Sequence, residues 1–541
     1  MVTTGRLHTR HLLRSVPSQG VEFWGWLGDR AAASQRLGLA ETESPAEFLR
    51  ETLAQFGVAG LEDLVGEFAA RIQTPTETLL VRDHLGIYPL YYGWDEDDRL
   101  IANPNLAIVR DRSVNGGVDE AAVAREMAWV LLGPKDETTF TGIHRVPPGH
   151  VTAVRGRADT RHVRYFHPEA VPARTLDFDA AELELEAVLH AAVSDAKGGS
   201  TRIGTHLSGG LDSGLVAGIA ARQLQPAEGL QLGVSWCPDQ ALDHSATEPT
   251  EVRMARLTAQ ALAVPLQHVN FAEVADSWIM KADPLIYRPW QAVFYEALCA
   301  PEFRRARLDV VLSGWGGDEV ASKNAAPPWA WLLRNRKYAE ALRGLRSRDT
   351  KTGRPGWSAA ARQLIPPKVK ARRRDKAAWI RPGAVEWAES HPEVLAQIVA
   401  QRAEGRTVRE QQIARMQRGH LSRRAEAWWQ IGHDFGYEYR YPLLDQRVVR
   451  WALSMSPNHF WSEGVGRRTF RAVARKYLPE AVAAHASKAE PARAARMVAH
   501  PTALVTTVTD YYPELREIAT INDRCNASSF AQIRQSIGSC G

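Results

Sequence analysis

The residues best suited to chemistry lie in one glycine-containing stretch, residues 207–213, with the sequence Leu-Ser-Gly-Gly-Leu-Asp-Ser. A short apolar run precedes this stretch and a helical pattern follows it, so we expect a turn between a strand and a helix. Glycine lets backbone N–H groups approach an anion closely, and a helix N-terminus adds unpaired donors and the positive end of its dipole. We therefore predict a phosphate site, but not a Walker loop, because no lysine follows the second glycine. The contacts are assigned to Leu207, Ser208, Gly209, Gly210, Asp212 and Ser213.

The acid in this turn indicates that a cation binds there too. Asp212 would repel a bare phosphate, and a divalent ion between them removes that conflict. A second glycine turn at residues 313–319 follows another apolar run and presents Asp318 in the same way. Two carboxylates at neighbouring strand ends suit Mg²⁺ on a triphosphate, so we predict ATP and Mg²⁺ as ligands, with Asp212 and Asp318 holding the metal. Further nucleotide contacts are assigned to Val234, Ser313, Gly314 and Gly317, and Glu319 joins the two aspartates as a catalytic candidate.

The spacing of apolar residues divides the chain into two parts. The first 170 residues contain short aromatic and β-branched runs separated by turn residues, with helical spacing between some of them. From residue 203 to 312 strands alternate with helices, which predicts an α/β fold with a parallel sheet covered on both faces. Both glycine turns follow strands of that sheet, where ligands bind in such folds. Beyond Trp329 the pattern is mostly helical to about Tyr477.

Between the two parts, residues 177–193 have the spacing of an amphipathic helix with an acidic start. Its apolar side is predicted to consist of Leu183, Leu185, Val188, Leu189 and Val193.

Length and composition indicate a globular protein of two or more domains. The chain has 541 residues, of which 45% are hydrophobic and 24% charged. Its four cysteines show no paired short spacing, which argues against a zinc site or a disulfide framework. No apolar run reaches the roughly 18 residues of a membrane span, and no signal peptide is recognised. We predict a cytoplasmic protein with no membrane partner.

The positive charge is concentrated in one segment. Residues 334–376 hold fifteen Lys and Arg against three acids, whereas the whole chain has a net charge of only +5. Such a basic insert is either a solvated loop or an electrostatic guide for an acidic partner. Nucleic acid is not expected as the partner, because aromatic residues are sparse there and no recognition module accompanies the charge.

Several segments resemble the asparagine synthetase superfamily. Residues 208–213 resemble the pyrophosphate loop of adenylating amidotransferases, and residues 312–319 and 438–445 resemble the superfamily's synthetase domain. Residues 82–92 and 142–150 resemble parts of its glutaminase domain. The resemblance implies an Ntn-type, glutaminase-like α+β sandwich at residues 1–170. An adenine-nucleotide α-hydrolase-like synthetase domain with added helices would follow at 171–541. The implied reaction is ATP-dependent amide formation, in which an acyl-adenylate forms, pyrophosphate leaves, and an amine displaces AMP.

The N-terminal residues depart from the superfamily pattern. The glutaminase of the family uses an N-terminal cysteine, but this chain reads Met1-Val2-Thr3-Thr4 and its first cysteine is Cys237. No Arg-Gly-Pro-type glutamine-binding segment is found either. We therefore expect a degenerate glutaminase-like domain and an amine that comes from the substrate itself.

Synthetase relatives without a working glutaminase close a ring within one substrate. The resemblance therefore implies one of two branches of such enzymes. One comprises β-lactam and carbapenam synthetases, and the other the lasso-peptide macrolactam cyclases. The form of residues 437–445, Trp315 between the glycines of the second turn, and the basic insert favour the peptide cyclase. The resemblance also implies a lysine that stabilises the adenylate, and the matching stretch at 485–491 points to Lys488. Glu319 and the acids near Glu426 and Glu438 remain open as the group that deprotonates the amine, as do the substrate itself, water and a residue not yet assigned.

The leading hypothesis is a lasso-peptide cyclase that adenylates an Asp or Glu side chain of a leaderless core peptide and joins it to the peptide's N-terminal amine. Its implied partners are that peptide, a leader-removing protease and a precursor-recognition protein. The alternatives are an asparagine synthetase-like or β-lactam-synthetase-like amide ligase on a small substrate, and a non-catalytic scaffold that binds nucleotide or peptide. The identity of the peptide, its ring size and the oligomeric state are left open by the sequence.

Overall fold

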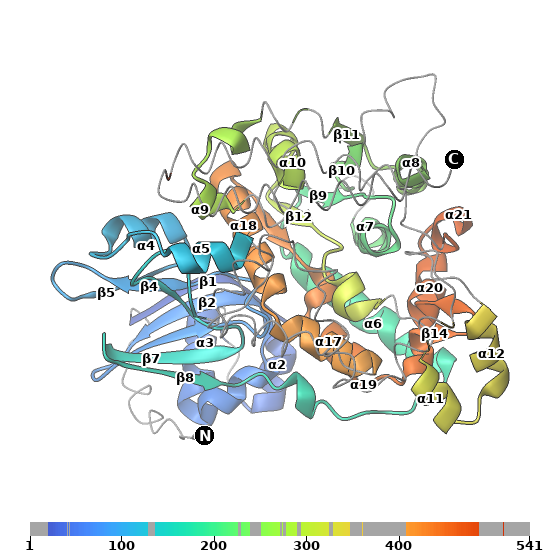
Figure 1. The fold of residues 1–541 in the computed structure, drawn as a ribbon, viewed down its shortest axis with the longest axis horizontal. Coiled ribbons are helices and arrows are strands. Elements are labelled where there is room, and N and C mark those ends of the chain that lie inside the picture. Colours follow the sequence, from blue (N-terminus) through green and yellow to red (C-terminus); the bar gives the residue numbers. More distant parts are fainter. Residues whose placement is uncertain are drawn as a thin grey trace.

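The computed structural model describes residues 20–39, 44–127, 136–224, 229–237, 250–270, 277–288, 294–323, 328–346 and 407–485, together with positions 42, 273, 357, 360 and 512. An N-terminal β-rich domain lies beside a larger α/β domain (Figure 1). The last strand of the first domain ends at Arg164 and the first long helix of the second begins at Phe178, so the predicted boundary at residue 170 falls in their connection. Within the described residues, no helix combines the length and apolar character needed to cross a bilayer.

The N-terminal domain is a sandwich of two antiparallel sheets. The first sheet has the order β1 (Val21–Gly28), β2 (Val65–Gln73), β3 (Thr78–Arg82), β7 (His150–Gly156), β8 (Asp159–Arg164). The second has the order β5 (Leu100–Asn103), β4 (Tyr91–Trp94), β6 (His144–Arg145). The helices of this domain are α2 (Arg30–Leu37), α3 (Pro45–Phe56), α4 (Leu106–Arg112) and α5 (Glu120–Met127).

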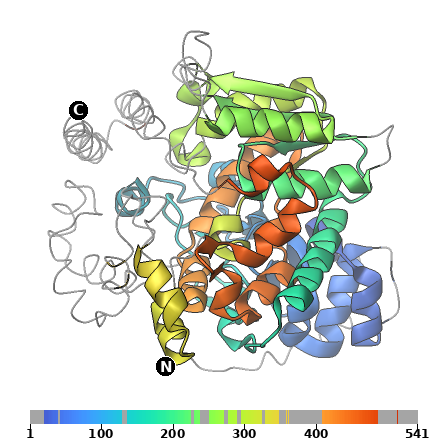
Figure 2. The same ribbon diagram turned by 90° about the vertical axis from the view of Figure 1, so that its right-hand side faces the viewer.

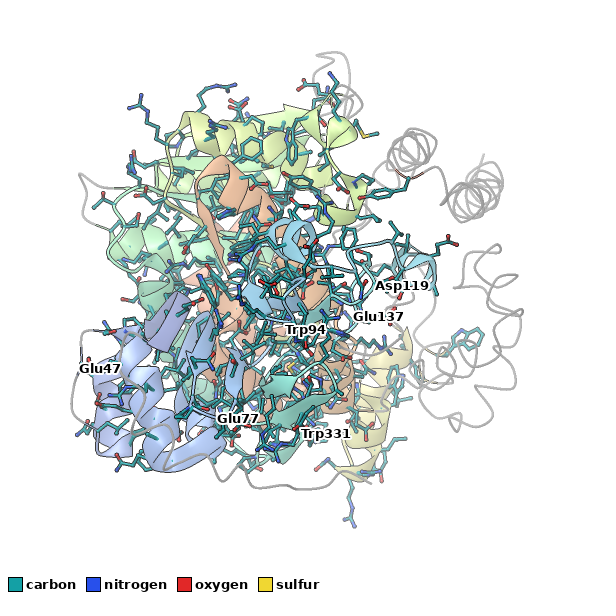
Figure 3. The ribbon with its side chains drawn as sticks, turned by 90° about the vertical axis from the view of Figure 1, so that its left-hand side faces the viewer. Glu47, Glu77, Trp94, Asp119, Glu137 and Trp331 are labelled. Atoms are coloured by element: carbon teal, nitrogen blue, oxygen red, sulfur yellow. The ribbon has the colours of Figure 1, made fainter. Side chains whose placement is uncertain are left out.

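Side chains that alternate between the two faces of the strands build the two apolar cores of this domain. On β3, Leu79 and Val81 face the core that also holds Phe48 of α3, whereas Leu80 faces the core between the two sheets. Successive side chains of a strand point to opposite faces, so strands buried on both sides read as continuous apolar runs. Trp94, at the end of β4, is buried in the core between the sheets and meets His144 edge-on (Figure 3).

The second domain is built on a five-stranded sheet whose strands are all parallel. Its order is β11 (Leu266–Asn270), β10 (Leu232–Cys237), β9 (Ile203–His206), β12 (Val310–Leu312), β13 (Glu438–Arg440). Helices α7 (Leu211–Gln223) and α8 (Thr250–Leu262) lie on one side of the sheet, and α10 (Phe294–Arg305) and α18 (His420–Phe435) on the other (Figure 1). The predicted parallel sheet is thereby confirmed.

The remaining helices pack around this core, as a view from the side shows (Figure 2). They are α6 (Phe178–Lys197), α9 (Pro284–Tyr287), α11 (Trp329–Arg334), α12 (Tyr338–Arg346), α17 (Val408–Gln417), α19 (Gln446–Ser454), α20 (Arg468–Arg475) and α21 (Glu480–Ala483). A short antiparallel pair, β14 (Trp461–Ser462) and β15 (Val465–Gly466), precedes α20. Helices α11 and α12 begin the basic insert. Residues 347–376 lie outside the described part of the chain, apart from 357 and 360.

One feature of these elements was not foreseen, and one prediction about them was wrong. The region beyond Trp329 is mostly helical in its described residues, as predicted, but the strand Glu438–Arg440 was not foreseen: it forms β13, the edge strand beside β12. Leu183 was placed on the apolar side of α6, yet it is 69% exposed, whereas Leu185 and Leu189 are fully buried. A helix turns about 100° per residue, so the buried side follows the four-residue spacing of Leu185, Leu189 and Val193, and Leu183 lies on the opposite side.

Candidate functional site

The two glycine turns meet at the point where the strand order reverses. From β9 the chain builds outward through β10 to β11, and it then returns to place β12 on the other side of β9. Ligands of open parallel sheets bind beyond the carboxyl ends of the strands at such a reversal. Because β9 and β12 are direct neighbours, the turns that follow them lie side by side.

The first turn exposes a helix start. Helix α7 begins at Leu211, and no side chain caps its first N–H groups. Ser213 Oγ lies 3.1 Å from Ser208 Oγ and holds the turn closed from within. Gly209 has φ +71°, and a Cβ there would lie only 2.2 Å from the carbonyl oxygen of Glu251. The turn therefore requires glycine and leaves backbone donors directed at the space beyond the strand.

The second turn packs directly against the first. A Cβ on Gly314 would lie 2.4 Å from the backbone nitrogen of Ser213, and a Cβ on Gly317 would lie 2.5 Å from Cγ of Asp212. Neither position has room for a larger residue. The glycines bring the two turns, and with them the two aspartates, into one site.

Asp212 and Asp318 converge on a third residue, Arg467. The Arg467 guanidinium donates to Asp212 Oδ2 at 3.0 Å and also to Asp318 Oδ1. Its side chain is 5% exposed, and the two aspartates raise its pKa above the ordinary value against the opposing effect of burial. One cation thus already bridges the two carboxylates. The pair offers the hard oxygen donors that Mg²⁺ prefers, so these residues fit the predicted metal.

A cavity of about 250 Å³ opens in front of the two turns. It is lined by the predicted residues Ser208, Gly210, Asp212, Ser213, Ser313, Gly314, Asp318 and Glu319. Glu319 is 8% exposed, and burial, with a further contribution from Asp318, raises the pKa of its carboxyl above the ordinary value. Among the acids that the sequence predicted for the site, Glu319 is the one best placed to hold a proton at the cavity surface.

One part of the cavity wall is aromatic and basic. Arg424 of α18 lies between two indoles, with its guanidinium carbon 3.8 Å from the ring centre of Trp315 and 4.4 Å from that of Trp428. All three side chains line the cavity. Stacking on two rings fixes the guanidinium, which places a rigid positive charge against Trp315 of the second glycine turn.

The remaining predicted residues lie behind the cavity or outside the described part of the chain. Leu207, Gly209 and Gly317 shape the turns. Val234 is fully buried on β10, and its carbonyl accepts the N–H of Leu207 at 2.8 Å, so its place in a purine pocket stays a prediction. Lys488 lies outside the described residues. Glu426 and Glu438 do not line the cavity.

Sequence reasoning missed several residues of this site. They are His206, Trp236, Glu251, Arg424 and Trp428, which line the cavity, and Arg467, which bridges the aspartates. His206 had a readable signal, because it is the last residue of the strand before the first turn. Arg424 and Arg467 had no such signal, because their positions depend on contacts between segments that are distant in the sequence.

Fold and site define a two-domain protein with a glutaminase-like sandwich and a nucleotide-type parallel sheet. The chain belongs to the asparagine synthase family, because the model of that family matches residues 184–502. A glutamine amidotransferase domain model matches residues 30–166. These matches confirm the predicted superfamily and fold class.

Two curated relatives illustrate the similarity. Asparagine synthetase [glutamine-hydrolyzing] 1 of Bacillus subtilis (strain 168) is 26% identical over 288 residues, which cover 52% of this chain and 43% of that protein. Amidase chyE of Penicillium rubens is 26% identical over 309 residues, which cover 51% of this chain and 42% of that protein. The matched stretches thus span less than half the length of either relative. Among solved structures, a glutamine phosphoribosylpyrophosphate amidotransferase from B. subtilis aligns over 46% of this chain and 45% of that chain, with 14% identity and a TM-score of 0.20.

Proposed function

We propose that this protein is an ATP- and Mg²⁺-dependent carbon–nitrogen ligase that activates a carboxylate as its adenylate and releases pyrophosphate and AMP on amide formation. The observation that carries the proposal is the convergence of Asp212 and Asp318, from two interlocked glycine turns, at the reversal point of the parallel sheet. Membership of the asparagine synthase family supports the same chemistry.

Each part of the site has a place in this reaction. The uncapped start of α7 and the hydroxyl of Ser208 would hold phosphate oxygens. Mg²⁺ held by Asp212 and Asp318 would offset the charge of the departing pyrophosphate. Arg467 adds a fixed positive charge beside the same carboxylates, and Lys488 remains the predicted cation for the acyl carbon. Exclusion of water from the reacting group within the cavity would limit hydrolysis of the activated acyl group.

Within this class we propose a lasso-peptide cyclase. The acyl donor would be an Asp or Glu side chain of a leaderless core peptide, and the amine its own N-terminus, so that an isopeptide macrolactam forms. Trp315 supports this assignment, because an indole at this position cannot serve as the titratable group that small-ring synthetases use. The aromatic wall around Arg424 also suits a peptide better than a small amino acid. A leader-removing protease and a precursor-recognition protein would supply the substrate.

The experiment compares amine sources. The full chain is incubated with ATP and Mg²⁺, and pyrophosphate release is measured with aspartate plus ammonia and with synthetic linear peptides that carry a free N-terminal amine and an internal Asp or Glu. Mass spectrometry then searches for peptides that have lost one water. Peptide-dependent release with such a product is the expected result.

Turnover with aspartate and ammonia alone would replace the cyclase with the small-substrate ligase, a reading that the asparagine synthetase relative favours. The third alternative, a scaffold without chemistry, predicts that Asp212→Ala leaves pathway product intact. Loss of product in a folded Asp212→Ala variant excludes it.

A further inference from the structure

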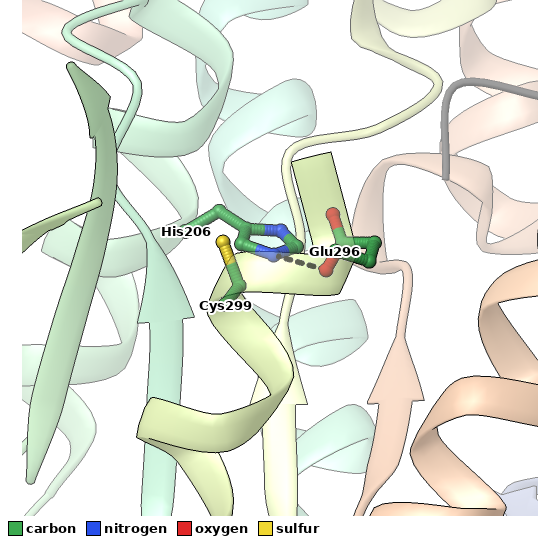
Figure 4. Close-up of side chains that lie close together, drawn as sticks. All are labelled: His206, Glu296 and Cys299. Carbon is green, nitrogen blue, oxygen red and sulfur yellow. Dashed lines mark hydrogen bonds and ion pairs between the residues drawn. The ribbon is translucent and has the colours of Figure 1, made fainter. Parts of the chain in front are cut away.

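Three polar side chains run in a line from the cavity wall into the protein core. Ser313 Oγ lies 3.3 Å from His206 Nδ1. On the other side of the ring, His206 Nε2 lies 3.1 Å from Glu296 Oε2, the contact that Figure 4 shows. Ser313 and His206 line the cavity, whereas Glu296 lies behind them and is fully buried. The line has the order hydroxyl, imidazole, carboxylate.

The sheet itself produces this alignment. The pairing of β9 with β12 sets Thr205 opposite Leu312, so the next residues along both strands, His206 and Ser313, face each other. Glu296 comes from α10, which covers that side of the sheet. Backbone register therefore fixes the first two members, and helix packing fixes the third.

Aromatic rings surround His206, and the carboxyl group of Glu296 contacts its ring. The rings of Trp236, Phe303, Trp428 and Tyr439 pack around the imidazole at centroid distances of 5.2 to 5.6 Å. Burial raises the pKa values of Tyr439, Tyr437 and Cys299 well above their ordinary values, so these groups keep their protons. Glu296 accepts the hydroxyl of Tyr439 as well as the His206 contact, and its Oε1 has no hydrogen-bond partner among the described residues.

These contacts fit an arrangement of protons that suits a relay. When Nε2–H of His206 donates to Glu296, the lone pair of the ring lies on Nδ1, where it accepts the hydroxyl proton of Ser313. Ser313 Oγ meanwhile accepts the backbone N–H of Trp315 at 3.2 Å. A serine held in this way can accept a proton from a ligand in the cavity as its own proton passes to His206.

We propose that Ser313, His206 and Glu296 form the relay that removes the proton from the attacking amine. The inference rests on the proposed function. As the amine nitrogen forms its bond to the acyl carbon, the bond from that carbon to the phosphate oxygen of AMP breaks. The amine proton moves to Ser313 Oγ, and the Ser313 proton moves to His206 Nδ1. The products are the amide, the AMP anion and an imidazolium paired with the Glu296 carboxylate. Glu296 acts as a positioning residue, because it contacts His206 and Tyr439 and does not line the cavity.

A metal centre is the competing use of the same residues. Ligand atoms of His206, Glu296 and Cys299 lie within 4.8 Å of one another. Binding a metal there requires a thiolate, whereas burial raises the pKa of the Cys299 thiol, and it also requires breaking the hydrogen bond between His206 and Glu296. The relay keeps every observed contact.

The kinetic test separates activation from amide formation. Carboxylate-dependent ATP–pyrophosphate exchange reports adenylation, and product formation from a synthetic linear peptide reports the amine step. His206→Gln is expected to keep exchange within about twofold and to slow product formation about 100-fold, the order of one general base. It should also remove the rise of the product rate with pH. Glu296→Gln should shift the midpoint of that rise to lower pH, because the imidazolium loses its counter-charge.

The matched control is His459→Gln, which replaces another buried, doubly hydrogen-bonded histidine outside the cavity. It should leave both rates and the pH profile as in wild type. Equal rates and pH profiles for His206→Gln and wild type would overturn the relay alone. Wild type without exchange on any carboxylate probe would overturn the proposed function, and the relay with it.

A second measurement does not depend on turnover. Nitrogen NMR of the full chain with ¹⁵N-labelled histidine, assigned by comparison with His206→Gln, should find a neutral ring protonated on Nε2 at pH 7. A proton on Nδ1, or on both nitrogens, would overturn the relay. So would one equivalent of tightly bound transition metal in the purified protein that disappears in Cys299→Ser.

Discussion

At the scale of single residues, Arg467 explains how two carboxylates can share a site before a metal arrives. Asp212 and Asp318 come from adjacent strand ends and would repel each other without a cation between them. The Arg467 guanidinium contacts both, and its backbone is held at φ +59°, a conformation that side chains rarely adopt. The aspartates are thus held in position by a cation of the chain itself.

Asp318→Asn tests this arrangement. Losing one carboxylate would remove one of the two proposed metal ligands and leave Arg467 facing a single anion, so ATP-dependent pyrophosphate release should fall about 100-fold or more, in the range of single electrostatic contacts to a reacting group. The Mg²⁺ concentration that gives half-maximal rate should rise. The measurement is a pyrophosphate assay across a Mg²⁺ titration.

The control for this variant is Asp309→Asn. Asp309 precedes the same strand, β12, but it forms an exposed ion pair with Arg202 at the other end of the sheet. Its replacement should change neither rate nor Mg²⁺ dependence. A rate for Asp318→Asn equal to that of Asp309→Asn would remove Asp318 from the metal site.

At the scale of elements, the site depends on how closely the two glycine turns pack. Gly314 stands against the backbone of Ser213, which is the first turn of α7. Backbone atoms cannot move aside as a flexible side chain can. The turns and the aspartates must therefore separate if a side chain is added there.

Gly314→Ala should cost most of the activity. The added Cβ would lie 2.4 Å from Ser213 N, so α7 and the second turn must move apart and the carboxylates lose their shared geometry. Pyrophosphate release should drop at least tenfold, because displacements near 1 Å of a reacting group have effects of that order or greater. Gly156→Ala, where nothing lies within 4 Å of the new Cβ, should keep wild-type activity. Full activity of Gly314→Ala would show that the turns need not interlock.

The sequence predicts the elements around the site well because their signals are local. Apolar runs followed by glycines define β9, β12 and both turns, and most residues assigned to the cavity lie there. β13 was missed because three residues between helices carry no periodicity, and pairing with β12 makes Glu438–Arg440 a strand. Arg467 and Arg424 were missed as site residues because each reaches the site through the packing of segments that are distant in the sequence.

At the scale of the whole molecule, the motif at residues 82–92 joins the two domains. Arg82 donates to backbone carbonyls of its own domain and to Glu426 of α18 at 2.8 Å, and both side chains are fully buried. His84 Nε2 lies 2.9 Å from the carbonyl of Leu444 in the second domain. Glu67 Oε1 accepts the backbone N–H of Tyr441 at 2.8 Å. The glutaminase-like domain thereby supports the segment that follows β13.

Glu67 should make this interface sensitive to pH. Burial raises the pKa of Glu67 from 4.5 to about 8, so the folded protein keeps this carboxyl protonated in a range where the unfolded chain has lost the proton. In this range the unfolded state binds fewer protons than the folded state. The free energy of unfolding of the protein should therefore fall by up to roughly 1.4 kcal/mol per pH unit as the pH rises from about 4.5 to 8. Glu67→Gln retains the acceptor for Tyr441 and should remove this contribution to the slope.

Thermal denaturation of wild type and Glu67→Gln at several pH values measures the difference. The variant should gain stability relative to wild type as pH rises toward 8 and should match it most closely near pH 4. Glu47→Gln, on α3 away from this interface, is the control and should retain the wild-type slope. Parallel curves for wild type and Glu67→Gln would contradict a protonated Glu67.

Glu426 is the centre of a buried charge network between the domains. It contacts Arg82, Arg145 and Arg288 at 2.8, 3.2 and 2.9 Å, and Arg145 also faces Glu126 at 3.5 Å. Burial alone would raise the pKa of Glu426, but the three arginines hold it well below the ordinary value. Three buried guanidinium groups thus share the carboxylate of Glu426, and Arg145 has a second, more distant partner in Glu126.

Glu426→Gln should therefore destabilise the protein by about 3 to 5 kcal/mol, the cost of leaving buried charges uncompensated. Glu169→Gln is the matched control: its side chain is 47% exposed and pairs with Arg164 at 2.8 Å, a surface contact that contributes about 0 to 1 kcal/mol. Denaturation curves should show both domains of Glu426→Gln destabilised together, because the carboxylate lies on one domain and Arg82 and Arg145 lie on the other.

Two other outcomes would contradict this role. If only the α/β domain were destabilised, the network would stabilise α18 alone. If Glu426→Gln unfolded like Glu169→Gln, the arginines would be stabilised by their backbone carbonyl contacts, and the domains would be held together by their apolar surfaces.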